Sequence, residues 1–102
     1  MIKIGQITAE AAAFAENLNY SVLPSEARHI ARRCIIDGIG QFVAGSATEP
    51  VKHVADDVIE QGGREDALVL GRGDVRVPAA LAARVLGTAG HALDWDDTQA
   101  SK

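Results

Sequence analysis

The feature that most constrains the fold is a regular apolar stripe in the first half of the sequence. Small or apolar residues recur every three or four positions, and most positions between them are polar or charged. Only an α-helix brings such positions onto one face. Pro24 suits a first helical turn, and the stretch 45–47 begins with a helix-ending glycine. The pattern therefore predicts a long amphipathic helix over about 24–45, with a stripe made of Ala27, Ile30, Ala31, Cys34, Ile35, Gly38, Ile39, Phe42 and Val43.

We expect this stripe to be the packed face of the helix. An interior glycine costs about 0.5–1 kcal/mol relative to alanine, so Gly38 predicts the close approach of another backbone. Cys34 is expected to be a small core residue rather than a nucleophile. It is the only cysteine in the chain. Internal disulfides and cysteine-based metal centres are thereby excluded, which fits a reducing compartment.

The rest of the chain predicts three shorter helices and one hairpin. An apolar stripe favours a helix from Ile7 to about Asn19, and another runs from a cap at Thr48 to the glycine pair at 62–63. Two β-favouring runs flank the turn residues 71–74, which is typical of a small hairpin near 67–77. A last helix begins at Pro78. The predicted fold is mostly α, with about four helices and one small β-hairpin.

The segment from Pro78 to Ala92 is apolar on almost every side, which is typical of a helix buried on almost every side. Ala79, Ala83 and Gly87 follow one another at four-residue spacing and would let a neighbouring helix approach closely. A chain of 102 residues builds only a modest core. We therefore expect residues 1–102 to form a partial helical domain. Its missing neighbours would come from a companion C-terminal chain or from another copy in a homo-oligomer.

Charge and hydropathy argue against a nucleic-acid-binding, membrane-spanning or secreted protein. The formal net charge is −4, with acidic and basic residues interleaved, so no cationic stripe is available for a nucleic acid. No run of 18 apolar residues occurs, and the start of the chain lacks the pattern of a secretory signal. We expect a cytoplasmic protein that neither spans a membrane nor binds nucleic acid.

Polar chemistry gathers near the end of the chain. Asp94, Asp96 and Asp97 crowd together one helical turn after His91. Repulsion between like charges and burial beside Trp95 would perturb carboxyl pKa values, and a carboxyl with a raised pKa could exchange protons with a substrate. Two alternatives stay open on spacing alone. The aspartates can form a solvated loop or helix cap, or His91, Asp94 and Asp97 can hold a hard divalent metal.

Two stretches of the sequence resemble the MmgE/PrpD family. The segments 23–26, 33–40 and 44–46 look like the first helices of that family. The segment from Gly87 to Thr98 is similar to its Gly-Thr-Ala-x-His-x-x-Asp-aromatic-Asp-Asp-Thr signature. The resemblance implies a helical domain with a smaller lid domain, usually in a homodimer. It also implies enzymes of the 2-methylcitrate dehydratase type, with decarboxylases and epimerases of small polycarboxylates, that require no organic cofactor.

Carried over residue by residue, the signature implies roles for five side chains. Asp94 becomes an acid/base or substrate contact, His91 positions the aspartate loop, and Thr98 contacts a substrate carboxylate. Asp96 and Asp97 support the loop. We therefore expect no cofactor and no metal. The chain would be an N-terminal fragment or subunit of a lyase, dehydratase or epimerase that moves a proton next to a carboxylate. The alternative is an inactive, truncated helical module that self-associates or binds a companion chain.

Overall fold

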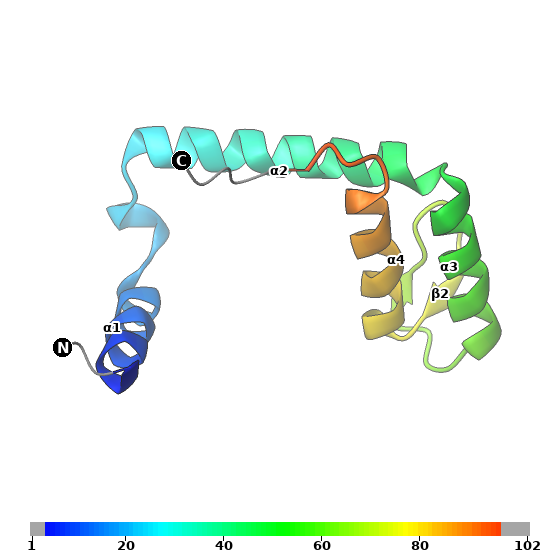
Figure 1. The fold of residues 1–102 in the computed structure, drawn as a ribbon, viewed down its shortest axis with the longest axis horizontal. Coiled ribbons are helices and arrows are strands. Elements are labelled where there is room, and N and C mark those ends of the chain that lie inside the picture. The colour runs from blue at the N-terminus through cyan, green and yellow to red at the C-terminus, as the bar shows by residue number, and fades with distance from the viewer. Residues whose placement is uncertain (1–3, 97–102) are drawn as a thin grey trace. The chain divides into compact units, whose positions relative to one another are not determined.

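A computed structural model describes residues 4–96 and confirms the predicted fold class (Figure 1). Four α-helices and one two-stranded antiparallel sheet make up this part of the chain. In chain order the elements are α1 (Ile4–Asn17), the 3-10 turn η1 (Tyr20–Val22), α2 (Ser25–Ser46), α3 (Glu49–Gln61), β1 (Ala67–Leu68), β2 (Arg76–Val77) and α4 (Ala79–His91). Although α2 has 22 residues, no described helix combines the length and apolarity needed to cross a membrane.

The chain divides into two units, Met1–Arg33 and Cys34–Lys102. No described residue of the first unit is buried, and local contacts define its structure. The side chain of Asn19 accepts a hydrogen bond from the backbone N–H of Ser21 at 3.1 Å and so caps η1. A guanidinium nitrogen of Arg32 donates to the Tyr20 hydroxyl at 2.7 Å. The guanidinium of Arg28 lies 4.9 Å from the centre of the Tyr20 ring, at cation–π distance.

Helix α1 begins three residues earlier than the sequence predicts. The predicted helix starts at Ile7, whereas α1 starts at Ile4. The hydroxyl of Thr8 donates to the carbonyl of Ile4 at 3.1 Å, inside the helix. A threonine that bonds back to the preceding turn lies within a helix rather than at its N-cap.

The core lies in the second unit, where α3 and α4 run side by side and the hairpin packs against both (Figure 1). Every buried apolar side chain among the described residues belongs to these elements or to the turn between the strands. They are Val51, Ala55, Val58, Val69, Val77, Ala82, Val85 and Ala89. These buried side chains are all valines and alanines, whose short side chains let the two helices and the hairpin approach closely.

Glycines set the ends of the core elements as predicted, while one cap works differently. Gly62 ends α3 with a positive φ of 61°. Gly71 and Gly73 also have positive φ values, and the strands pair with Ala67 opposite Val77. Thr48 occupies the N-cap position of α3, but its hydroxyl donates to the carbonyl of Gly45 at 2.7 Å instead of accepting from its own helix. Thr48 therefore ties α3 to the end of α2.

Helix α2 meets α4 at a backbone contact that only glycine permits. A Cβ added at Gly45 would lie 1.9 Å from the carbonyl oxygen of Ala89, and one added at Gly90 would lie 2.7 Å from the Phe42 ring. The sequence predicts this close approach at Gly38, where no atom lies within 4 Å of an added Cβ. A glycine of α2 does allow another backbone to come close, as predicted, but among the described residues that glycine is Gly45 and not Gly38. The contact falls at the end of α2 because that is where α4 crosses it.

For residues 4–96, the predicted burial of the α2 stripe is wrong, and the predicted burial of α4 is met on one face. The stripe of α2 is largely exposed, with Ile35 at 62% and Ile39 at 55%, and Cys34 is exposed as well. Helix α4 buries the face made by Ala82, Val85 and Ala89, whereas Ala79, Ala83 and Gly87 are exposed. Periodicity identifies which face is apolar, but it does not tell whether a neighbour covers that face. No described segment covers either one.

The contact at Gly45 predicts a position-specific response to one added methyl group. Gly45→Ala would push the Ala89 backbone away and lower the free energy of unfolding by about 2 kcal/mol. Gly87→Ala is the matched control, because nothing lies within 4 Å of an added Cβ there and the helix gains about 0.5–1 kcal/mol. Urea unfolding followed by circular dichroism measures both. Equal stability of the two variants would contradict the contact.

Candidate functional site

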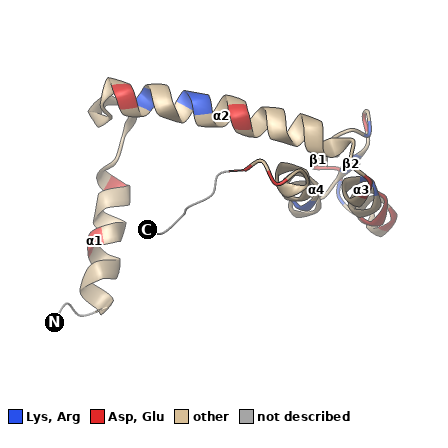
Figure 2. Cartoon of the chain, turned by 45° about the horizontal axis from the view of Figure 1, so that its top comes forward, with Lys and Arg blue, Asp and Glu red and all other residues tan. Residues whose placement is uncertain are grey.

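The predicted site residues lie where the chain reverses after α4. The helix ends at His91, and the backbone N–H of Asp94 donates to the carbonyl of His91 at 2.9 Å. Asp94 has a φ of 55°, which places it in the left-handed region that short polar side chains tolerate better than most. The acidic residues of this reversal follow α4 directly in Figure 2, where they are red. The turn brings the side chain of Asp96 back to the end of the helix.

His91 and Asp96 form the central contact of the site. The Nδ1 atom of His91 lies 2.9 Å from Oδ1 and 3.0 Å from Oδ2 of Asp96. The hydrogen bond to Asp96, aided by the charges of Asp96 and Asp94, raises the pKa of His91. The same hydrogen bond, now from His91, lowers the pKa of Asp96. Each partner therefore favours the charged form of the other.

The direction of the shift at Asp96 corrects the prediction of a raised carboxyl pKa. Burial beside Trp95 was the expected cause, but the Trp95 side chain is 67% exposed and provides no enclosure. The side chains of His91 and Asp96 are themselves 71% and 43% exposed. The hydrogen bond from His91, together with a backbone hydrogen bond, outweighs the opposing effect of desolvation, and the pKa of Asp96 falls.

The pair also fixes which nitrogen of His91 is available for chemistry. A carboxylate that faces Nδ1 holds the proton on that nitrogen. The Nε2 atom of neutral His91 is then left with its lone pair, and on protonation it becomes a donor. The arrangement can hold a proton at His91 or orient a ligand there.

Three side chains could approach a cation. Ligand atoms of His91, Asp94 and Asp96 all lie within 4.8 Å of one another. The alternative left open by the sequence used Asp97 as the third ligand, and Asp97 lies outside the described residues. Imidazole and carboxylate donors together suit a divalent metal. A metal at Nδ1 would have to displace the proton that Asp96 holds, so the observed geometry is that of an ion pair.

A hollow of about 440 Å³ lies between α2 and this reversal. Its lining residues come from both sides: Cys34, Asp37, Gly38, Gln41 and Phe42 from α2, and Gly87, Gly90, His91 and Asp96 from α4 and its end. Three glycines leave the walls without side chains, so the hollow stays open. Asp94 is not among the lining residues.

Sequence reasoning missed Asp37 and Gln41 as site residues, because both fall on the polar face of α2. The side-chain amide of Gln41 donates to the carboxylate of Asp37 one turn earlier. Their position beside Gly38 on the helix was the available signal. The structure thus brings His91, Asp94 and Asp96 together and adds two residues of α2. The predicted Asp97 and Thr98 lie outside the described part of the chain.

The ion pair predicts the titration of His91. The contact stabilises protonated His91 fully at pH values below 6.5, the ordinary pKa of histidine. This stabilisation disappears as the pH rises through the raised pKa of His91. The charged form of Asp96 is stabilised above the ordinary value of 3.8 and loses this as the pH falls through the lowered pKa. Both partners are therefore charged at pH values between the lowered pKa of Asp96 and the raised pKa of His91. In a proton NMR titration, Asp96→Asn should lower the pKa of His91, and an unchanged value would contradict the pairing.

Comparison with known proteins places this chain in a family. The MmgE/PrpD N-terminal domain matches residues 9–102. A cis-aconitate decarboxylase from Mus musculus is 36% identical over 67 residues, which cover 66% of this chain and 14% of the mouse protein. The chain thus spans a small part of the length of that relative. No solved structure matches it. Since the family match includes nearly all of the sequence, the chain belongs to the MmgE/PrpD family, within its N-terminal domain.

Proposed function

We propose that this chain supplies part of the active site of a cytoplasmic enzyme that moves a proton beside a carboxylate of a small polycarboxylate. The observation that carries the proposal is the contact between His91 and Asp96, which closes the loop that holds Asp94. That loop lies in the segment with the family signature. The name of the mouse relative makes cis-aconitate the first substrate to try.

In this proposal Asp94 transfers the proton. During a decarboxylation the bond between carbon and the departing carboxylate breaks, its electron pair stays on carbon, and that carbon takes a proton from an acid. During a dehydration or an epimerisation a carboxylate first removes a proton from carbon. Protonated Asp94 suits the first role and ionised Asp94 suits the second. His91 acts through Asp96 as a positioning residue for the loop.

Charge explains why this site needs further groups. Asp37, Asp94 and Asp96 surround a single histidine, so the described site is acidic even when His91 is protonated. A polycarboxylate is repelled by such a surface, and the negative charge that develops in the reaction needs cationic stabilisation. We propose that a companion segment or a second copy brings these cations. Thr98 would contact a substrate carboxylate, and Asp97 would support the loop.

Removal of the Asp94 carboxylate tests the proposed role. The chain is combined with the polypeptide encoded next to it, or with the C-terminal remainder of the mouse relative, and CO₂ release from cis-aconitate is measured. Asp94→Asn should lower kcat by about 10²–10⁴-fold, as expected for loss of a general acid or base. Asp57→Asn is the matched control, because it makes the same change at an exposed carboxylate of α3.

Undiminished turnover with Asp94→Asn, beside an active wild type, would rule out this role. Absence of turnover in every combination and with other small polycarboxylates would favour the second candidate function.

That second candidate is an inactive helical module that self-associates or binds a companion chain. The observation that favours it is the exposed stripe of α2, which includes Ile35 and Ile39. Its residues form two rows with four-residue spacing, which suits a helix crossing at about −50°. Gly38 lies midway along the stripe and has open space above it. A crossing helix could approach α2 most closely at this glycine.

A pair of glycine substitutions tests this contact. Both Gly38→Ala and Gly40→Ala add one methyl group to α2 where no atom lies within 4 Å, so both should leave the fold intact. Only Gly38 lies on the stripe. Sedimentation equilibrium should therefore show association weakened about tenfold by Gly38→Ala, by overpacking at the crossing, and unchanged by Gly40→Ala. Equal behaviour of the two variants would argue against the stripe as the contact surface.

A further inference from the structure

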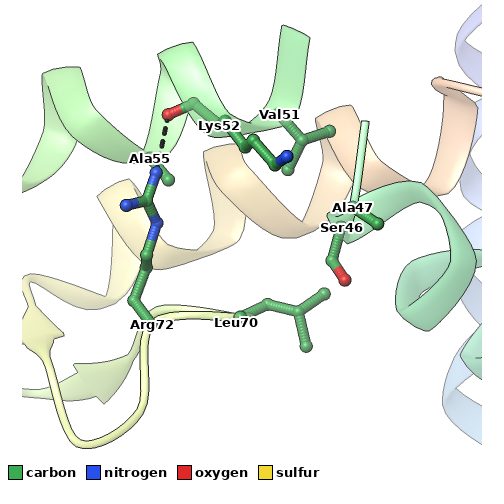
Figure 3. A pocket seen from close by; sticks show the side chains of 8 residues that line it. Ser46, Ala47, Val51, Lys52, Ala55, Leu70 and Arg72 are labelled. Carbon is green, nitrogen blue, oxygen red and sulfur yellow. Dashed lines mark hydrogen bonds between the residues drawn. The ribbon is translucent and has the colours of Figure 1, made fainter. Parts of the chain in front are cut away.

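A second hollow, of about 360 Å³, lies between the start of α3 and the hairpin turn (Figure 3). Its lining residues are Ser46, Ala47, Val51, Lys52, Ala55, Leu70, Gly71 and Arg72. None of them lines the hollow at His91. The two hollows also differ in charge. The titratable groups that line this one are a lysine and an arginine.

Arg72 is held in place by one end of its guanidinium group. Its Nη2 atom donates to the backbone carbonyl of Lys52 at 3.0 Å, drawn as a dashed line in Figure 3, and lies 2.6 Å from a carboxylate oxygen of Asp56. These contacts use one of its three nitrogens. The Nε and Nη1 atoms have no partner among residues 4–96. A guanidinium that is already fixed loses little entropy when its remaining donors bind a carboxylate.

Lys52 provides a second, more flexible cation. Its ammonium group has no ion-pair partner within the described part of the chain, and Figure 3 shows its side chain extending along the hollow toward Val51 and Ala47. The start of α3 lies at the same place, and the positive end of its dipole adds to the potential. Ser46 adds no donor, because its hydroxyl donates to the carbonyl of Val43 at 2.6 Å.

The floor of the hollow is apolar. Val51 and Ala55 are each only 1% exposed, and Leu70 is half-buried against the same core. A fully hydrated inorganic anion would gain nothing from this surface. A hydrocarbon group on a carboxylate would shed water there while its charged end stays at the cationic rim.

We propose that this hollow binds a small organic carboxylate with a short apolar body. The carboxylate accepts a hydrogen bond from the free Nε–H of Arg72, Lys52 closes over it, and the hydrocarbon lies on Val51, Ala55 and Leu70. Asp56 weakens the attraction for the ligand, because its carboxylate already offsets part of the positive charge of Arg72. The site is separate from the proposed reaction at Asp94 and does not depend on it.

Butanoate is the probe, and its neutral isostere butanamide is the matched control. In an ¹H–¹⁵N NMR titration of the 102-residue chain, butanoate should cause saturable shifts at Val51, Ala55, Leu70 and Arg72. The expected dissociation constant is in the millimolar range for so small a ligand. Butanamide should bind at least about fivefold more weakly. Equal binding of the two, or tighter binding of inorganic phosphate than of butanoate, would overturn the proposal.

Two charge changes of opposite sign sharpen the test. Lys52→Gln should weaken butanoate binding about two- to fivefold, the range expected for an exposed charge pair, whereas Asp56→Asn should strengthen it by removing a negative charge beside Arg72. The controls Arg76→Gln and Asp57→Asn make the same charge changes outside the hollow. Spectra without ligand verify that each variant is folded. Equal effects of variant and control would show a general charge effect and would overturn the site.

Discussion

The close approach of Gly45 to Ala89 is the contact on which the rest of the second unit depends. It lets the end of α2 touch the backbone of α4, and Phe42 then packs against Gly90 one turn away. Both contacts lie in the last turns of α4, directly before His91. The helix end that carries the candidate site is therefore fixed against α2. Small residues are required here because any side chain would hold the two backbones apart.

The site depends on this contact in a second way. Because α2 passes close to α4 at Gly45, Asp37 and Gln41 line the same hollow as His91 and Asp96. Within the loop, the ion pair between His91 and Asp96 holds the backbone in place, as buried apolar side chains do in the core. It closes the six residues 91–96 into a turn without an apolar cluster, since Trp95 is exposed. The loop is held by charge and by backbone geometry, so its order should depend on pH as well as on packing.

The sequence predicted the elements well because their signals are local. The three- and four-residue spacing around Ile35 and Ile39, the glycines that end α3, and the hairpin turn at Gly71 and Gly73 each depend on neighbours within a few positions. The exposure of the apolar side chains on α2 could not be predicted in the same way. Whether Cys34 is covered depends on which segment packs on α2, and no local pattern carries that information.

The site shows the same division between local and distant information. His91, Asp94 and Asp96 could be chosen from the signature, because they lie within six positions of one another. The pairing partner of His91, the direction of the pKa shift at Asp96, and the presence of Asp37 depend on how the chain reverses and on what α2 brings to it. The chain reverses through the left-handed backbone conformation of Asp94. The spacing of the acidic residues in the sequence does not predict that conformation.

The two hollows divide the charges of the second unit in a way that bears on the proposed reaction. Carboxylates surround the hollow at His91, whereas Lys52 and Arg72 lie at the other one. A small anion that meets these surfaces is attracted to the hairpin side and repelled from the side that carries the family signature. For a polycarboxylate to reach Asp94, cationic groups from outside residues 4–96 must reverse that preference. In the proposed reaction, the same groups would stabilise the charge that develops as the proton moves, so binding and proton transfer would depend on one set of side chains from outside residues 4–96.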